Sequence, residues 1–330
     1  MSAQARTPHR VHLIAHANPA MKDVIRYGLA GLDEYFGFIK EHLPAPHRLT
    51  YTKRIFEIVE DQSRAGRRDD AARIRDLQNA LDDPNTLAIV SASGGAYLTR
   101  ILPHLDFSPL TKRTSPLWIT GFSEITNLVN LIASYRGGRG LYWLCPNYLG
   151  WKIRPRKQSL AAFGEFWRNL PDVLAGRTPE EVKHVPLGPI EGRIASGKAT
   201  SGRVRLVGGC LSVLVAMLAG PLAKRMRPDG AWLALEDIGE EPYRIDRHLA
   251  ALKLAGWFDR VAGVLIGRFH ADGEDQLSAV LEYLKYHLPA DRRLPVVTTD
   301  SFGHAWPMVP VPINTPLQMH VTGRKVSIGK

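Results

Sequence analysis

Cysteine is scarce in this chain of 330 residues, which contains only Cys145 and Cys210. Two cysteines cannot form a disulfide framework, so we expect a reducing compartment, the cytoplasm. The sequence also lacks a Cys-x-x-Cys pair, His-Glu-x-x-His spacing and EF-hand spacing, and it has no phosphate-loop or dinucleotide fingerprint. These absences favour an enzyme that works without a metal or another cofactor.

Long hydrophobic runs are also scarce. The uncharged stretch Leu206–Ala223 approaches transmembrane length, but glycines and a proline, among them Gly208 and Pro221, interrupt it. A buried core helix is therefore favoured over a membrane span. Within the N-terminal segment 1–19, the apolar run Val11–Ala15 is too short for a signal peptide, so we predict neither export nor membrane association.

Acidic residues are outnumbered by basic ones. The 43 Lys and Arg against 32 Asp and Glu give a formal net charge of +11, while 45% hydrophobic and 23% charged residues are typical of a globular protein. This charge predicts anionic partners without specifying them. Arg136–Lys157 and Arg193–Arg227 each contain several basic residues and no acid.

The first part of the chain, from residue 11 to about residue 135, alternates short apolar runs with helix-like segments. The clearest runs are Val11–Ala15, Thr86–Ser91 and Pro116–Thr120, and Glu124–Tyr135 has the apolar spacing of a helix. This alternation predicts a layered α/β domain with a parallel sheet.

The second part begins after a stretch that is rich in glycine, proline and aromatics and contains a predicted helix at Leu160–Leu174. Apolar runs at Ala231–Leu235 and Val261–Ile266, a helix near Asp246–Ala255 and strand-like segments to the end follow. We predict an N-terminal α/β domain over 1–150, a connector over 151–195 and a C-terminal domain over 196–330.

A serine stands at the junction of a predicted strand and a predicted helix, in Gly121-Phe122-Ser123-Glu124-Ile125-Thr126. Such a turn exposes the Ser123 hydroxyl, and amides at the helix start can stabilise an oxyanion. A plain helix N-cap would give the same local pattern. The pair Gly94-Gly95 follows another strand and could aim amides at a negative oxygen, although an ordinary strand-to-helix connection would also contain it.

Two further candidates lie in the second part of the chain. Leu235–Glu241 contains four carboxylates that could orient a histidine or bind a cation, or could form a solvated edge. Of the twelve histidines, His304 in Phe302-Gly303-His304 has the strongest setting for chemistry, although a single histidine is more often a surface or core residue.

Taken in order, these pieces resemble the LD-carboxypeptidase family of serine peptidases, which includes the microcin C self-immunity proteins. The resemblance runs from about Asp82 to His304. It rests on Asp82-Asp83-Pro84, Gly94-Gly95, Leu102-Pro103-His104-Leu105-Asp106, Gly121–Thr126, Gly208-Gly209-Cys210-Leu211-Ser212, Leu235-Glu236-Asp237 with Gly239-Glu240, Tyr243-Arg244-Ile245-Asp246-Arg247, and Gly303-His304.

The resemblance implies an N-terminal α/β domain, a β-rich swivelling C-terminal domain and a homodimer. It also implies a triad in which Ser123 is the nucleophile, His304 the general base and Glu236 the residue that orients the histidine. The amides of Gly95 and Glu124 are our candidates for the oxyanion hole. No metal is required.

Several positions depart from the family pattern. Ser93 replaces an arginine that often precedes the glycine pair, Ala96-Tyr97 replaces Tyr-Gly after it, and Cys210 replaces an asparagine. A lysine usual before the serine strand is missing, and Pro116-Leu117 stands there. We therefore expect a divergent member, with the changes affecting substrate more than fold.

Three functions remain open. The first is release of the terminal D-Ala of a murein tetrapeptide at an L-to-D amide bond. The second is hydrolysis of a peptidyl or aminoacyl nucleotide of the microcin C kind, in which aromatic faces stack a base. The aromatics considered for that role are Tyr142, Trp143, Tyr148 and Trp151. The third is a catalytically impaired homologue that binds anions.

Substrate binding is predicted for Ser93, Gly94, Arg154 and Arg156. Arginines hold carboxylates and phosphates well, so we expect part of this basic charge, at Arg154 and Arg156, to capture a small anionic peptide or peptidyl nucleotide. Nucleic acid is not the expected partner.

Overall fold

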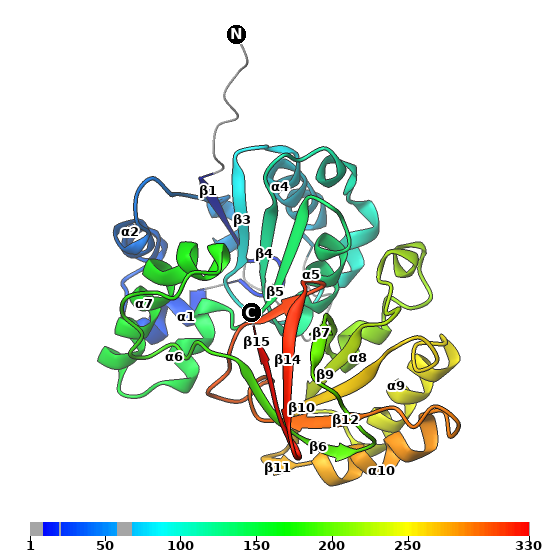
Figure 1. Cartoon of the computed structure of the whole chain (residues 1–330). Helices are drawn as coiled ribbons and strands as arrows, with labels where there is room; N and C mark the ends of the chain where they lie inside the picture. The colour runs from blue at the N-terminus through cyan, green and yellow to red at the C-terminus, as the bar shows by residue number, and fades with distance from the viewer. Residues whose placement is uncertain (1–8, 20, 58–67, 330) are drawn as a thin grey trace. The chain divides into compact units, whose positions relative to one another are not determined.

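The computed structural model describes residues 9–19, 21–57 and 68–329 (Figure 1). Residues 1–8 of the N-terminal segment discussed above lie outside this range. None of the helices in the described part is long and apolar enough to cross a membrane. The chain divides into two compact units. Unit 1 takes its residues from 1–125, 135–139 and 144–186, and unit 2 comprises 126–134, 140–143 and 187–330.

Unit 1 contains a parallel sheet with the strand order β2-β1-β3-β4. These strands are β1 (Arg10–Ile14), β2 (Arg48–Thr50), β3 (Thr86–Ser91) and β4 (Leu117–Gly121). The helices of the unit are α1 (Met21–Tyr27), α2 (Leu32–His42), α3 (Lys53–Glu57), α4 (Asp70–Asp82), α6 (Leu149–Lys152) and α7 (Arg156–Ala175), with short 3₁₀ turns η1 (Thr99–His104), η2 (Ser108–Thr111), η3 (Ser123–Ile125) and η4 (Pro146–Tyr148). The three apolar runs predicted in this region are strands in the structure.

Helix α7 is longer than the predicted helix Leu160–Leu174 and packs against α1 and α2. Its Phe163 ring stacks on Tyr27 with ring centroids 4.5 Å apart and on Tyr35 at 5.5 Å. The helix ends at Gly176, which has a φ of 71°, a conformation that favours glycine. Aromatic packing therefore holds α7 to the rest of unit 1.

Unit 2 contains a mixed sheet. Its strand order is β13-β8-β9-β10-β12-β6-β15-β14-β7, in which β8, β9, β10 and β12 are parallel. The strands are β6 (Ile190–Ser196), β7 (Gly202–Val204), β8 (Leu206–Cys210), β9 (Trp232–Ile238), β10 (Gly263–Ala271), β12 (Val296–Thr299), β13 (Val311–Ile313), β14 (Leu317–Thr322) and β15 (Lys325–Gly329), with β11 (Glu274–Asp275) paired to β10. Strand β5 (Gly138–Tyr142) pairs antiparallel with β13 through residues 140–142.

The helices of unit 2 are α5 (Thr126–Ala133), α8 (Leu211–Val215), α9 (Pro242–Leu254) and α10 (Leu277–His287), with the 3₁₀ turn η5 (Pro221–Arg225). The predicted helix near Asp246–Ala255 corresponds to α9, and the predicted runs Ala231–Leu235 and Val261–Ile266 correspond to β9 and β10. The predicted helix Glu124–Tyr135 corresponds to α5, preceded by η3.

The prediction of a buried helix over Leu206–Ala223 is wrong, because the segment begins with strand β8 and continues into the short helix α8. Gly208 and Gly209 have φ values of 119° and 137°. A Cβ atom at Gly208 would lie 2.2 Å from the carbonyl oxygen of Ala234 on β9. An apolar run of this kind is also typical of a parallel strand buried on both faces, and the glycines allow the close approach of the two strands.

A buried polar cluster lies between β1 and α4. His16 is fully buried, and its Nε2–H donates to the carbonyl oxygen of Arg73 at 2.9 Å. His12 lies 3.2 Å from Asp76, which is 3.5 Å from His16. Burial lowers the pKa of His16 to about 4, although the Asp76 carboxylate acts in the opposite direction. The folded protein therefore holds His16 neutral at pH 7.

We expect the stability of the protein to fall as the pH decreases from about 6.5 to about 4. In this window the unfolded chain binds a proton at His16 and the folded chain does not, which costs roughly 3 kcal/mol of unfolding free energy at the lower end. Urea unfolding at pH 7.5 and pH 5 measures the loss. It should be smaller in His16→Gln and unchanged in His47→Gln, which alters a partly exposed histidine outside this cluster. Equal losses in all three proteins would contradict the assignment.

Candidate functional site

Ser123 lies at a sharp turn between β4 and the helical segment that continues into α5. It is one of the non-glycine residues with a positive φ, at 61°. Gly121 at the end of β4 has a φ of 157°, and a Cβ there would lie 3.0 Å from the Ile125 side chain. The structure therefore has the strand-to-helix turn predicted for this serine, in a conformation that costs energy and is often found at functional sites.

The glycine pair lies directly against this serine. A Cβ atom at Gly94 would lie 2.9 Å from Ser123 Cβ and 3.3 Å from its hydroxyl oxygen. Gly95 has a φ of 146°, and a Cβ there would lie 2.6 Å from the carbonyl oxygen of Ala17. Only glycine fits at these two positions, because any side chain would displace the serine or the backbone.

Residues 92–98 connect β3 to η1 and contain the glycine pair, and we call them the glycine loop. A buried carboxylate, Asp23 on α1, anchors the start of this loop. The Ser93 hydroxyl donates to Asp23 Oδ2 at 2.6 Å, and Trp151 Nε1 donates to Oδ1 at 2.8 Å. Asn147 Nδ2 donates to Oδ2 at 3.3 Å. Ser93, which replaces the arginine of the family pattern, therefore ties the loop to α1 and α6. Sequence reasoning missed Asp23, because its partners are 70 or more residues away along the chain.

Removal of the Asp23 carboxylate is expected to destabilise unit 1. Asp23→Ala leaves the Ser93 hydroxyl and the Trp151 N–H without their acceptor, and we expect a loss of about 2–4 kcal/mol in unfolding free energy. Urea unfolding at pH 7 measures it. The matched control is Asp33→Ala, because the Asp33 side chain is 85% exposed and pairs with Lys53 on the surface. A loss as small as that of the control would contradict the anchoring role.

Two more side chains hold the other end of the loop. The carboxylate of Glu124 accepts hydrogen bonds from the amides of Leu98 at 2.8 Å and Thr99 at 2.9 Å, and burial raises its pKa. The fully buried Arg73 donates to the carbonyl oxygen of Tyr97 at 2.9 Å. The side chain of Glu124 therefore positions the glycine loop, whereas the predicted oxyanion role concerns its backbone amide.

The predicted substrate arginines lie on the surface of unit 1. Arg154 donates to the carbonyl oxygen of Gly150 at 3.2 Å. The Arg156 side chain covers Gly28 at the end of α1, where a Cβ would lie 2.9 Å from Arg156 Cδ. Both residues are exposed.

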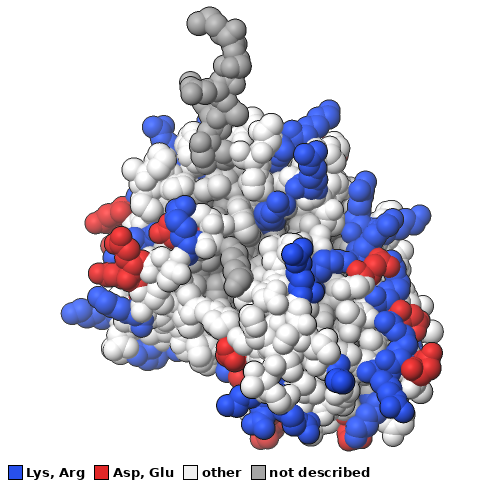
Figure 2. Space-filling view, in the orientation of Figure 1, with Lys and Arg blue, Asp and Glu red and all other residues white. Residues whose placement is uncertain are grey.

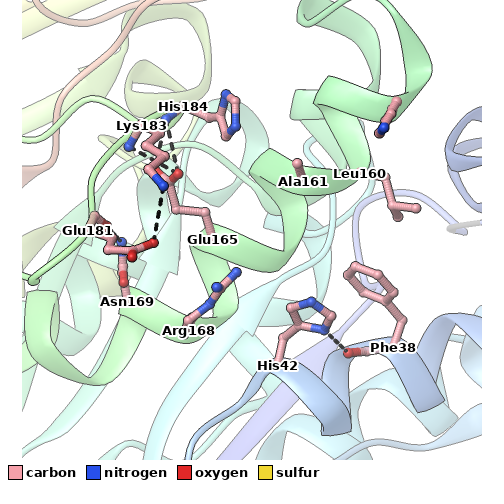
Figure 3. Close-up of a pocket in the computed structure, with 11 residues that line it drawn as sticks. Phe38, His42, Leu160, Ala161, Glu165, Arg168, Asn169, Glu181, Lys183 and His184 are labelled. Carbon is pink, nitrogen blue, oxygen red and sulfur yellow. Dashed lines mark hydrogen bonds and ion pairs between the residues drawn. The ribbon is translucent and has the colours of Figure 1, made fainter.

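A pocket of about 400 Å³ lies on unit 1 along α7 and the segment 181–184, with Phe38 and His42 of α2 on its other side (Figure 3). The Glu165 carboxylate accepts hydrogen bonds from the amides of His184 at 3.0 Å and Val185 at 2.8 Å. This carboxylate holds the segment 181–185 on α7. The pocket contains both cationic and acidic side chains, and sequence reasoning missed it because its walls come from three separate stretches.

In unit 2, Glu236 on β9 is fully buried and holds His304. Glu236 Oε2 lies 2.7 Å from His304 Nδ1 and accepts the His304 backbone amide at 3.1 Å. A carboxylate is an acceptor, so His304 Nδ1 carries the proton and Nε2 is left as the acceptor. The imidazole is therefore fixed in the tautomer that a general base requires.

Tyr142 on β5 is a second partner of this carboxylate. Its hydroxyl donates to Glu236 Oε1 at 2.5 Å. Tyr142 is 1% exposed and its neighbour Trp143 is fully buried, so these two of the four aromatics are core residues and present no face to a nucleobase. The aromatic spacing was compatible with either role, because solvent exposure is decided by the packing of the sheet.

The adjacent Asp237 is buried as well. It accepts hydrogen bonds from the Ser212 amide at 2.7 Å and hydroxyl at 3.0 Å, while Cys210 Sγ lies 3.4 Å away. Burial, with a smaller effect of Glu236, raises the pKa of Asp237. Burial also raises the pKa of the Cys210 thiol, which excludes a reactive thiolate at neutral pH. Glu236 and Asp237 therefore do not form a solvated edge. In the described parts of the two units, no group of three or more His, Cys, Asp or Glu side chains is arranged so that it could hold a metal ion.

Comparison with known proteins links both units to one family. Residues 11–142 match the model of the LD-carboxypeptidase N-terminal domain, and residues 203–319 match that of the LD-carboxypeptidase C-terminal domain. A putative carboxypeptidase of Streptomyces coelicolor is 32% identical over 94% of this chain and 90% of its own length.

Two relatives carry more specific names. The probable murein peptide carboxypeptidase of Bacillus subtilis is 31% identical over 78% of this chain and 76% of its own length. The murein tetrapeptide carboxypeptidase of Pseudomonas aeruginosa is 29% identical over 90% of both chains.

Solved structures show a similar fold. The muramoyltetrapeptide carboxypeptidase from Oxalobacter formigenes covers 97% of both chains with a TM-score of 0.67 and 21% identity. The microcin C7 self immunity protein MccF in complex with aspartyl sulfamoyl adenosine covers 98% of this chain and 97% of its own, with a TM-score of 0.69 and 17% identity. At these identities the likeness concerns the fold alone, and it confirms the predicted α/β fold class.

Proposed function

The chain belongs to the LD-carboxypeptidase family and is a serine-type carboxypeptidase hydrolase, and from this premise we propose that it releases the terminal D-Ala of a murein tetrapeptide by cleaving an L-to-D amide bond. The names of the Bacillus and Pseudomonas relatives support this substrate class. The observation that carries the proposal is the hydrogen bond of 2.7 Å between the buried Glu236 and the partly buried His304, which prepares a general base in a family of serine peptidases.

The proposed mechanism uses Ser123, His304 and Glu236. His304 Nε2 takes the proton of the Ser123 hydroxyl as the oxygen attacks the scissile carbonyl, and it then protonates the leaving amine. Glu236 stabilises the imidazolium and keeps the ring oriented, assisted by the hydrogen bond from Tyr142. A water molecule, activated by the same histidine, hydrolyses the acyl enzyme.

The oxyanion hole is proposed to be formed by the backbone amides of Gly95 and Glu124. Gly94 packs on Ser123, so the glycine loop is close to the nucleophile within unit 1. Binding of the stem peptide is assigned to this loop and to Arg154 and Arg156, because guanidinium groups pair well with its carboxylates. The Ser93 side chain positions the loop through its hydrogen bond to Asp23 and, being buried, does not contact the substrate directly.

The proposal is tested with the purified protein and murein tetrapeptide, followed by mass spectrometry. We expect conversion to the tripeptide with release of free D-Ala. A tetrapeptide that ends in L-Ala is the matched control and should remain intact. Absence of D-Ala release at micromolar enzyme, or equal cleavage of the two peptides, would contradict the proposed specificity.

A second candidate function is hydrolysis of an aminoacyl nucleotide analogue. It is favoured by the fold shared with MccF, which was solved with aspartyl sulfamoyl adenosine, and by the half-exposed Trp151, whose ring lies 3.1 Å from Arg26 Cζ. Incubation with aspartyl sulfamoyl adenosine separates the two candidates, since this function predicts release of aspartate and the murein function predicts none.

A third candidate, an anion-binding homologue without activity, predicts that a serine-reactive phosphonate fails to label Ser123. We also propose that the protein acts in the cytoplasm and forms a homodimer. Analytical ultracentrifugation of the purified chain tests the dimer, and a single species of 36.7 kDa would contradict it.

A further inference from the structure

Three arginines gather around a pocket of about 230 Å³ in unit 2. Arg205, Arg225 and Arg227 line this pocket, which we call the arginine pocket. Arg205 directly precedes β8, and the other two lie at the end of η5 and just after it. The described residues that line the pocket include no Asp or Glu. The lining therefore has a local charge of about +3 with no acidic neighbour in it.

The acid that follows these arginines in the chain, Asp229, pairs with an arginine outside the pocket lining. Both carboxylate oxygens of Asp229 bind Arg260, at 2.8 Å and 2.6 Å. Arg205 contacts Asp229 only through a hydrogen bond to its backbone carbonyl. Basic side chains are also more widespread than acidic ones on the face of the molecule in Figure 2. The side-chain carboxylate of Asp229 is therefore engaged by Arg260 and not by Arg205.

The Arg205 guanidinium group is held in a fixed orientation by a neighbouring asparagine. Arg205 Nη1 donates to Asn314 Oδ1 at 2.8 Å, and the same asparagine caps the carbonyl oxygen of Ala133 at the end of α5 through its Nδ2 at 2.8 Å. A guanidinium group has five N–H donors, so Arg205 retains further donors for a ligand. The buried Val207 and Met226 form apolar parts of the wall, which strengthen electrostatic attraction.

The arginine pocket lies away from the Glu236–His304 pair. In the parallel pairing of β8 and β9, Leu206 is opposite Trp232 and Cys210 is opposite Glu236. Four residues of strand separate the two levels, a distance of about 13 Å. The pocket therefore opens at the amino ends of these strands, and Glu236 lies at their carboxyl ends.

We infer that the arginine pocket binds a small oxyanion of two or more charges, either free phosphate or the phosphate group of a small metabolite. Planar guanidinium groups match the geometry of phosphate oxygens. The volume is below the range of about 300–1,000 Å³ that is typical of pockets for larger organic ligands. The pocket along α7 lacks this character, because Glu165 and Glu181 are among its lining residues (Figure 3).

The test is calorimetric titration of the full chain with inorganic phosphate and, separately, with glycerol 3-phosphate. We expect both the wild type and the Arg154→Gln/Arg156→Gln variant to bind at least one of these two titrants. Arg225→Gln/Arg227→Gln should bind at least about tenfold more weakly, since it removes two of three guanidinium groups. The matched control is Arg203→Gln, which removes an exposed arginine of β7 outside the pocket. Tighter binding of one titrant identifies the source of the phosphate group.

Three results would overturn the inference: no heat of binding with either titrant in the wild type, an equal loss in Arg203→Gln, or a loss confined to the Arg154 and Arg156 variant. Binding of a single-stranded oligonucleotide that depends on Arg225 and Arg227, without binding of the small anions, would also overturn it in favour of a polyanion surface. Thermal unfolding checks that the variants fold. D-Ala release should persist in Arg225→Gln/Arg227→Gln, so failure of this inference is distinguishable from failure of the proposed function.

Discussion

Replacing Ser123 with alanine is expected to lower D-Ala release from murein tetrapeptide by a factor of at least about 10⁴, because the attacking oxygen is lost and only binding and oxyanion stabilisation remain. The fold should be retained. Alanine keeps the Cβ atom against which Gly94 packs, and it tolerates the positive φ at this turn no worse than serine does.

The measurement is the initial rate of tripeptide formation by mass spectrometry, with thermal unfolding to verify the fold. Ser108→Ala is the matched control, because Ser108 is exposed and its hydroxyl binds only Asp106. A serine-reactive phosphonate should label the wild type and Ser108→Ala, and leave Ser123→Ala unlabelled. Retention of more than about a tenth of the wild-type rate by Ser123→Ala would remove this serine from the mechanism.

Replacing Glu236 with glutamine is expected to lower kcat by about 10³–10⁴-fold with little change in KM. Glutamine has the same size and can still accept the hydrogen bond from Tyr142, but it is neutral and cannot stabilise an imidazolium at His304. The ring also loses the acceptor that fixes its tautomer. The effect therefore belongs to the transition state and not to substrate binding.

Steady-state kinetics of D-Ala release measure this effect. Glu241→Gln is the matched control, since Glu241 is an exposed carboxylate just after β9, and it should behave as the wild type. Tyr142→Phe removes one of the hydrogen bonds to Glu236 and is expected to have a smaller effect, about tenfold. An increase in KM at constant kcat in Glu236→Gln would indicate a binding role and contradict the orienting role.

Much of the local structure could be predicted from the chain. The apolar runs at β1, β3 and β4 and the helical spacing of α5, α7 and α9 are local signals, and these elements occur where they were expected. The failure at Leu206–Ala223 has a specific cause. Periodicity does not distinguish a buried strand from a buried helix, and the positive φ of Gly208 and Gly209 follows from the neighbouring β9.

The residues around the site were harder to predict. Ser123, Glu236 and His304 stand in motifs of several residues each, and a family resemblance is sufficient to single them out. Asp23 and Tyr142 have no such motif. Asp23 contacts Ser93 across 70 residues of sequence, and Tyr142 contacts Glu236 across 94, so each becomes visible only when the partner strands and helices are in place.

The excess of basic over acidic residues, the scarcity of cysteine, the turn that presents Ser123 and the order of the motifs are properties of the sequence alone, because each depends on composition or on neighbours along the chain. The tertiary structure decided which carboxylate holds His304, which aromatics are buried and where the basic segments lie. It brings Arg205, Arg225 and Arg227 together around one pocket and engages the carboxylate of Asp229 with Arg260. The physical reason is that burial, hydrogen-bond partners and local charge depend on contacts between residues far apart in the sequence, which no local pattern records.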